Sequence, residues 1–276
     1  MLTLFPKFKK RMIIFEVVYV ALMVTLYVLK PTASPIALAL MLIVGGLFIA
    51  AAQYINALNT HNRQLNRLYN QLDAEGFLKE YELHLQQNPS NPQLYTMVRL
   101  HLTNAYAAQG RFDEAMKLLT STPIRACKKP EQTLMNRFAV TSNLCYCAEQ
   151  MGDLDAAKKY LDELHGYKKQ LEAIQETKKP KQRMAFSCEL NDQCMKLLST
   201  GKCDVQALKT QVQSNNTQQL HRITTSLWIA RAYLAEQNRR EAENILQQIV
   251  KLAPDLYPGK EAARMLAELP AAAQAK

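Results

Sequence analysis

Cysteine and histidine are the side chains of this sequence best suited to metal binding or nucleophilic catalysis. The cysteines are Cys127, Cys145, Cys147, Cys188, Cys194 and Cys203, and the histidines are His61, His84, His101, His165 and His221. The closest pair, Cys145 and Cys147, is separated by about 200° on a helix, so the two thiols point apart. No Cys-x-x-Cys pair or framework spacing occurs. We therefore expect buried or half-buried free thiols in a reducing compartment and no metal site.

Sequence motifs of catalysis and cofactor binding are missing as well. The chain has no P-loop, no dinucleotide-binding glycine motif, no HExxH, no GxSxG and no EF-hand loop. Glycine is too scarce outside helix ends for a loop that cradles phosphate with its backbone amides. The sequence therefore predicts no catalytic residue, no metal, no cofactor and a protein that is not an enzyme.

Two apolar runs occupy the N-terminal part of the chain. Residues 12–29 contain one charge, Glu16, and residues 36–55 contain none. Each run is long enough to cross a bilayer core of about 30 Å as a helix. Pro31 and Pro35 separate them and favour a tight turn. A cleaved signal peptide is the alternative for the first run, but no small-x-small cleavage site follows. We expect a two-helix transmembrane hairpin over residues 12–55.

The distribution of basic residues predicts the orientation of this hairpin. Four basic residues lie within 7–11, only Lys30 lies between the runs, and Arg63, Arg67 and Lys79 follow the second run. Basic residues favour the cytoplasmic side. We expect an integral cell membrane protein of the bacterial inner-membrane type, with two spans, a basic cytoplasmic N-terminus (1–11) and both termini in the cytoplasm.

Two features of the spans are unusual. Glu16 lies five residues beyond Arg11, near the expected interface, where it can pair with Lys9, Lys10 or Arg11. The pair Gly45-Gly46 provides a small-residue surface. The glycines suit packing of the two spans on each other or of one copy on another, and the sequence leaves both alternatives open.

Beyond residue 55 the apolar residues recur at helical spacing, and no alternating run is long enough for a strand. The glycines of this part (76, 110, 152, 166, 201 and 259) stand where helical patterns stop, as is typical of helix ends. The predicted fold class is all-α.

One short pattern recurs along this helical part. The stretch NAYAAQGRFDEAMKLL (104–119) can be aligned with residues 142–161 and 231–255. In the first two copies the alignment pairs Gly110 with Gly152, Phe112 with Leu154 and Ala115 with Ala157. In the third copy Tyr233 and Ala242 have the same separation as Tyr106 and Ala115. Two weaker copies cover 72–92, which includes Pro89, and 185–212, which includes Gly201.

This pattern resembles the tetratricopeptide repeat, a helix–turn–helix unit. Departures are Thr103, Ala148 and Arg239, and Gln237 where the turn glycine belongs. The resemblance implies an α-solenoid of stacked helical hairpins, in which small residues allow close approach. The implied packing residues are Tyr106, Gly110, Phe112, Ala115, Gly152, Ala157, Tyr233 and Ala242.

In this family the first helix of each hairpin lines a concave groove for a protein or peptide partner. The family register places Asn104, Ala108, Asn143, Tyr146 and Arg231 there as candidate binding residues. Some members hold a carboxylate with two asparagines and several cations. Leu100, Cys188 and Asp192 stand where cations belong, so we do not predict carboxylate capture.

The segment between the hairpin and the repeats carries a 3,4 stripe of Ile55, Leu58, Asn62, Leu65, Tyr69 and Leu72. The second span is expected to continue through it as one helix that packs on residues 77–87. A short coiled coil, and so a homodimer through residues 55–72, is the alternative. We predict a juxtamembrane helix pair or degenerate first repeat at 56–92, a solenoid at 93–269 and a disordered tail at 270–276.

The formal net charge is +10. The basic clusters, of which 178–183 is the longest, lack the interleaved aromatics of a nucleic-acid surface. We expect no nucleic acid. Attraction to anionic lipid headgroups is a simpler explanation of the basic clusters than nucleic-acid binding. The simplest explanation is that residues 178–183 form a solvated loop without a binding role.

The sequence thus predicts a membrane-anchored scaffold or adaptor that mediates protein–protein interactions at the cytoplasmic face. The alternative is a subunit of a larger membrane complex, in which the hairpin itself is functional and the solenoid assembles or regulates it. A tethered helical enzyme domain is a third option, which no residue supports.

Overall fold

The computed structural model describes residues 1–29, 34–87, 91–174, 178–213 and 218–269, and every helix or strand element in these ranges is an α-helix. This confirms the all-α prediction. The chain divides into two compact units, Met1–Leu65 with Gln86–Pro89, and Asn66–Leu85 with Ser90–Lys276.

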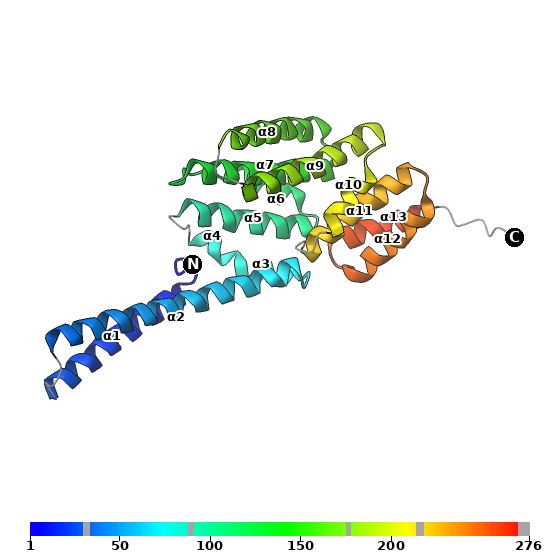
Figure 1. Ribbon diagram of the computed structural model, residues 1–276. Helices are drawn as coiled ribbons and strands as arrows, with labels where there is room; N and C mark the ends of the chain where they lie inside the picture. The colour runs from blue at the N-terminus through cyan, green and yellow to red at the C-terminus, as the bar shows by residue number, and fades with distance from the viewer. Residues whose placement is uncertain (30–33, 88–90, 175–177, 214–217, 270–276) are drawn as a thin grey trace. The chain divides into compact units, whose positions relative to one another are not determined.

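The first unit contains α1 (Pro6–Leu29) and most of α2 (Pro35–Tyr69) (Figure 1). Both helices are long and apolar enough to cross a membrane, and their most apolar stretches are not buried within the protein. Val17 is 63% exposed and Phe48 is 75% exposed. A surface of this kind is unusual for a protein in water. The predicted turn at residues 30–33 lies outside the described residues.

Contacts between α1 and α2 account for one of the two adjacent glycines. The Tyr19 hydroxyl donates a hydrogen bond to the carbonyl oxygen of Met41 at 2.7 Å. A Cβ on Gly45 would overlap the Tyr19 ring, whereas a Cβ on Gly46 would meet open space. Gly45 therefore serves the packing of the hairpin. The expected ion pair of Glu16 with a nearby basic residue is not found in the part of the chain that the structure describes.

Helix α2 continues without a break to Tyr69, as the sequence predicts. The predicted buried stripe of this helix is correct at Tyr69, which is buried, but wrong at Ile55 and Asn62, which are both exposed. The buried residues from the second half of this helix are Gln53, Ala57, His61, Gln64, Leu68 and Tyr69. One reason is that aromatic residues of the N-terminal segment, which the sequence predicts only as a basic cytoplasmic region, pack against this helix. The Phe5 and His61 rings meet edge-on, with their centroids 6.4 Å apart.

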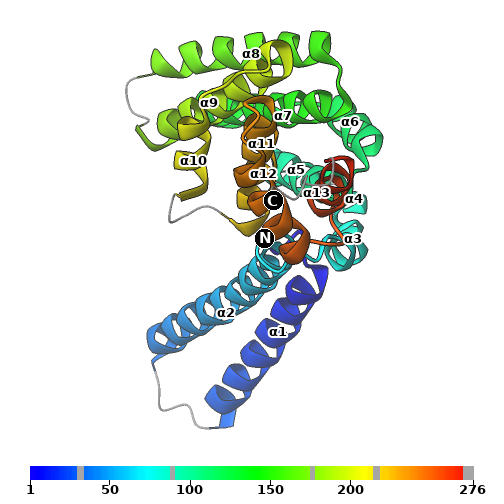
Figure 2. The ribbon, with the colours of Figure 1, turned by 90° about the vertical axis from the view of Figure 1, so that its right-hand side faces the viewer.

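The second unit is a stack of helical hairpins (Figures 1 and 2). Four hairpins, α5–α6, α7–α8, α9–α10 and α11–α12, pack in succession, and α13 packs on the last. The helices beyond α2 are α3 (Ala74–Tyr81), α4 (Leu83–Gln86), α5 (Pro92–Ala108), α6 (Phe112–Thr120), α7 (Pro130–Met151), α8 (Leu154–Glu172), α9 (Lys178–Thr200), α10 (Val205–Gln213), α11 (Gln219–Ala235), α12 (Arg239–Leu252) and α13 (Tyr257–Glu268).

Three of the hairpins turn in the same way. Gly110, Gly152 and Gln237 follow the first helix of their hairpins with positive φ angles of 81°, 75° and 59°. The next residue in each case donates its backbone N–H to the carbonyl five residues earlier, which is the Schellman arrangement. These bonds run from Arg111 to Tyr106 at 2.9 Å, from Asp153 to Ala148 at 3.0 Å and from Asn238 to Tyr233 at 2.8 Å. The three turns predicted to correspond therefore have the same geometry.

The core runs continuously through the stack. One cluster of buried apolar residues joins α5, α6 and α7, a second joins α7, α8 and α9, and a third joins α9 to α12. Ala115, Ala157 and Ala242 are each 0% exposed, and Phe112 and Tyr233 are each 8% exposed. Small residues at these points let the two helices of one hairpin approach closely, as expected for repeats of this kind.

The weaker copy at 185–212 also has a structural counterpart. Residues 185–212 form parts of α9 and α10, with Gly201 at a φ of 69° between them. The basic run at 178–183 was expected to be a loop but is helical from Lys178 onward. Pro180 is compatible with this because the first-turn N–H groups of a helix have no partner within the helix. Pro89 and the tail 270–276 lie outside the described residues.

Candidate binding site

The first helices of the four hairpins line one cavity with a volume of about 320 Å³. Such a volume lies at the lower end of the range for small-ligand pockets, about 300–1,000 Å³. The end of α2 contributes Tyr69 to the same wall. The lining also includes Asn104 and Ala108 from α5, Asn143, Tyr146 and Glu149 from α7, Ser187 and Asn191 from α9, and His221, Thr225 and Trp228 from α11.

Four of the five candidate groove residues lie on this wall: Asn104, Ala108, Asn143 and Tyr146. Arg231 is not among the residues that line it. The repeat register therefore brings α5 and α7 residues together at one hollow surface. Their role in binding a partner remains a prediction.

The register was misleading on α9 and α11. Cys188 is buried in the core between α8 and α9, and Asp192 bonds the Nε2 of His165 at 2.9 Å. The cavity instead takes residues that sequence reasoning missed, among them Asn191 and the one tryptophan of the chain, Trp228. On α11 the lining residues Leu220, Thr224 and Trp228 recur every four positions, a signal that was readable from the sequence once this helix was assigned to the groove.

A chain of hydrogen bonds crosses one side of the cavity. Asn143 Nδ2 donates to Asn104 Oδ1 at 3.0 Å, and Asn104 Nδ2 donates to the Tyr69 hydroxyl at 2.8 Å. The Tyr69 oxygen lies 2.7 Å from Nδ1 of His101, to which its hydroxyl is free to donate. Burial raises the pKa of Tyr69 to about 12, so this hydroxyl keeps its proton. The two asparagines at the carboxylate-binding positions of the family are thus bonded to each other.

Three other polar atoms of the lining residues have no hydrogen-bond partner among the described residues. They are Oε2 of Glu149, Nδ2 of Asn191 and Oγ1 of Thr225, and each is buried. The residues themselves are 3%, 5% and 1% exposed. Buried polar atoms in proteins nearly always have a partner, so each exception calls for an explanation.

Glu149 has a strongly perturbed carboxyl group. Its Oε1 accepts a hydrogen bond from the Cys145 thiol at 3.5 Å. Burial raises the pKa of Glu149 to about 8, although the Cys145 bond and the charge of Arg231 act in the opposite direction. His221 also lines the cavity, and burial lowers its pKa. Near pH 7 the empty cavity therefore has no full charge on either group.

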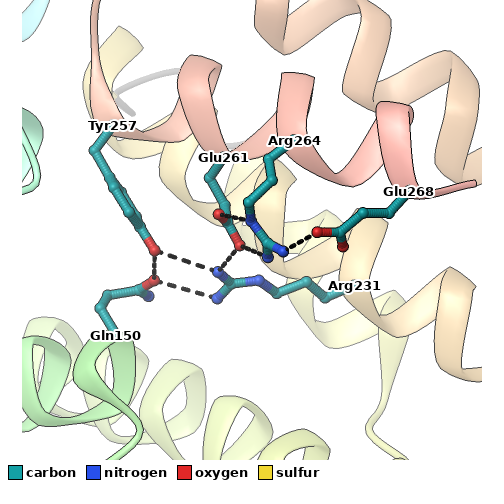
Figure 3. Close-up of polar contacts among 6 residues, drawn as sticks. All are labelled: Gln150, Arg231, Tyr257, Glu261, Arg264 and Glu268. Atoms are coloured by element: carbon teal, nitrogen blue, oxygen red, sulfur yellow. Dashed lines mark hydrogen bonds and ion pairs between the residues drawn. The ribbon is translucent and has the colours of Figure 1, made fainter.

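Arg231 belongs to a polar cluster that joins α7, α11 and α13 (Figure 3). Its Nη2 lies 3.2 Å from Glu261 Oε1, and its Nη1 donates to Gln150 Oε1 at 3.2 Å. The Tyr257 hydroxyl donates to the same Gln150 oxygen at 3.2 Å. The guanidinium also lies over the Trp228 ring at 4.6 Å. Arg231 is thus held by the protein's own groups.

The same cluster fixes α13 against the first hairpin. The Tyr257 and Phe112 rings meet edge-on, with their centroids 4.8 Å apart. The Tyr257 ring also lies against Gly110 at the first repeat turn. Arg264 binds Glu261 from the outer side at 2.8 Å. The hydrogen bond of Arg264, followed by the charge and bond of Arg231, lowers the pKa of Glu261 despite its burial.

Four of the six cysteines are buried and two are half-buried. All six are free, and no group of three or more metal-ligating side chains occurs among the described residues. Burial raises the pKa of Cys147 to about 12 and that of Cys188 to about 11. These thiols therefore remain protonated, unlike nucleophilic cysteines, whose pKa is lowered.

Comparison with known proteins adds one finding. Residues 225–255 match the family model described as tetratricopeptide repeat. The matched range covers most of α11 and all of α12. Searches of curated proteins and of solved structures found no match.

Proposed function

Because the chain is a tetratricopeptide repeat protein, we propose that it is a membrane-anchored adaptor that holds a protein or peptide partner in the cavity between α5, α7, α9 and α11. Repeats of this family support a scaffold role in protein–protein interactions, and its members are generally not catalytic. The observation that carries the proposal is the cavity itself: the first helices of four successive hairpins contribute to one hollow, and polar atoms in its wall lack partners.

Photocrosslinking in cells tests this proposal. A photoreactive amino acid replaces Ser142, which lines the cavity, or Lys158, which is exposed on α8. We expect a crosslinked protein from position 142 and none of the same mass from position 158. Equal products from both positions, or products from position 158 alone, would contradict a partner site in the cavity.

The membrane part of the proposal places α1 and α2 across a bilayer, such as the bacterial inner membrane, with both termini in the cytoplasm. It is supported by their length and by the exposure of their apolar side chains. Cys127 is half-buried in the second unit and provides a test. We expect a membrane-impermeant maleimide to label it only after permeabilisation, with Cys127→Ser as the control. Labelling in intact cells would reverse the orientation.

A second candidate function makes the hairpin itself a contact surface within a larger membrane complex. One observation favours it: a Cβ on Gly46 would meet open space, and the next two residues, Leu47 and Phe48, are exposed. Replacing residues 12–55 by an unrelated two-helix anchor should abolish function under this candidate, whereas the adaptor should tolerate the exchange. Homodimerisation through residues 55–72 and contact with anionic headgroups stay predictions, which analytical ultracentrifugation in detergent and vesicle binding can test.

A further inference from the structure

Among the described residues that line the cavity, Glu149 has the one carboxyl group. Its Oε2 is buried without a hydrogen bond, and its neighbour on the other oxygen is a thiol, which is a weak donor. A buried carboxylate is stable in its charged form only with a cationic or strongly donating partner. No such partner comes from the described residues of the protein.

Arg231 is the candidate for an internal partner, because its positive charge lowers the pKa of Glu149. Its guanidinium, however, is bonded to Glu261 and Gln150 and stacked on Trp228. Glu261 compensates its charge within the cluster. Glu149 is therefore left for a group that enters the cavity from outside.

We propose that the cavity recognises a basic side chain, lysine or arginine, of the partner peptide, with its cationic head bound to the Glu149 carboxylate. This inference rests on the proposed function and names the chemistry of its partner. The hydrocarbon stem of a basic side chain suits the apolar part of the wall, which includes Tyr146, Ala108 and Trp228. The aromatic faces add attraction for the cation.

The other two unpartnered atoms fit the backbone of such a peptide. Asn191 Nδ2 is a donor that can bond a peptide carbonyl oxygen, and Thr225 Oγ1 can donate or accept. The Asn104–Asn143 pair is already bonded within the protein and so is not required for the ligand. The set of unpartnered atoms complements a cation attached to an amide backbone: one belongs to a carboxyl group that a bound cation would stabilise in its ionised form, and two belong to neutral polar groups.

Fluorescence of Trp228 gives a direct measurement, because it is the one tryptophan of the chain and it lines the cavity. The probes are capped pentapeptides with alanines around a central lysine, norleucine or glutamate, and n-butylammonium alone, titrated into the full-length protein in detergent. We expect the lysine peptide to bind about tenfold more tightly than the norleucine peptide, the usual effect of one charge-assisted hydrogen bond. The glutamate peptide should bind most weakly.

Variants assign the effect to Glu149. In Glu149→Gln the preference for lysine over norleucine should disappear, while the norleucine peptide binds as before, which shows that the cavity is intact. Glu172→Gln makes the same chemical change at an exposed position of α8 and should leave the preference unchanged. Equal binding of lysine and norleucine peptides by the unchanged protein, or a preference that survives Glu149→Gln, would overturn the inference. Equal affinity for n-butylammonium and the lysine peptide would mean that the cavity recognises the amine alone, and this would contradict recognition of a peptide.

The outcome is separable from that of the proposed function. A partner crosslinked from position 142, together with no lysine preference, would support the adaptor and overturn the basic side chain as its contact. A lysine preference without a crosslinked partner would support the charge recognition and count against a protein partner in cells.

Discussion

Glu149 and Gln150 are neighbours on α7, yet they belong to polar regions with opposite properties. Gln150 joins the cluster around Arg231, in which the charged and polar groups are bonded to each other across three helices (Figure 3). Glu149 lines the cavity, where its Oε2 and two further buried polar atoms have no partner.

The difference shows how the same residue types can serve structure in one region and binding in another. A buried polar group that is fully bonded fixes the helices that carry it. A buried polar group without partners costs stability, and this cost is recovered when a ligand supplies the missing bonds. The Arg231 cluster holds α7, α11 and α13 together, whereas the unpaired polar atoms of the cavity are available to a ligand.

Four experiments test this contrast.

The pH dependence of stability should show the largest effect. The folded protein keeps the Glu149 proton up to a pKa of about 8, whereas the unfolded chain loses it near pH 4.5. The contribution of Glu149 is therefore full at low pH and is lost as the pH rises, by about 3 kcal/mol between pH 5 and pH 8. The free energy of unfolding, measured in urea for the full-length protein in detergent, should fall by this amount relative to Glu149→Gln.

Comparing the pH profiles of the unchanged protein and of Glu149→Gln cancels the contributions of the other titrating groups to the free energy of unfolding. His221, whose burial lowers its pKa, changes stability with the opposite sign, because the unfolded chain binds its proton first as the pH falls. Burial raises the pKa of the nearby Cys145 and Cys194 thiols, so both stay protonated over this range. Parallel profiles for the unchanged protein and Glu149→Gln would show that the carboxyl group is not buried as described.

Glu261→Ala should have the next largest effect. Glu261 and Arg231 have side chains that are 14% and 19% exposed, so removal of the carboxylate leaves a poorly hydrated guanidinium. We expect the free energy of unfolding to fall by about 2 kcal/mol, less than for a fully buried pair. An unchanged urea midpoint would mean that the cluster does not hold α13.

Tyr257→Phe should have a smaller effect. It removes the hydroxyl bonded to Gln150 but keeps the ring against Phe112 and Gly110. The loss of one partly buried hydrogen bond should cost about 1 kcal/mol. In a Gln150→Ala background the same change should cost much less, and a double-mutant cycle measures this coupling. Additive losses would place the Tyr257 hydroxyl outside the cluster.

Arg264→Ala should have the smallest effect. Arg264 binds Glu261 from the solvent side and is itself 56% exposed, and exposed ion pairs contribute little to stability. We expect a thermal midpoint equal to that of the unchanged protein within error. A loss as large as that of Glu261→Ala would identify Arg264, and not Arg231, as the main partner of Glu261.

The fold was largely predictable from local features of the chain. Gly110 and Gly152 marked turns that require a positive φ, and Ala115, Ala157 and Ala242 marked the close approach of helices. At the site, the repeat register located the α5 and α7 residues of the cavity, because those two units keep the family pattern. It did not locate the α9 residues of the cavity, where the pattern is weak. It also named Arg231, which lies in the segment that matches the family model but is held away from the cavity lining by Gln150 and Glu261 of other helices.

The sequence by itself determined the helical class, the repeat turns and the two apolar helices, since each follows from backbone preference and apolar spacing within a few residues. Only the tertiary structure decided which polar groups are bonded and which are free. Arg231 meets Gln150 across 81 positions of the chain, and Asn143 meets Asn104 across 39. Partners this distant are set by the packing of whole helices, which also leaves Glu149, one residue from Gln150, facing a cavity.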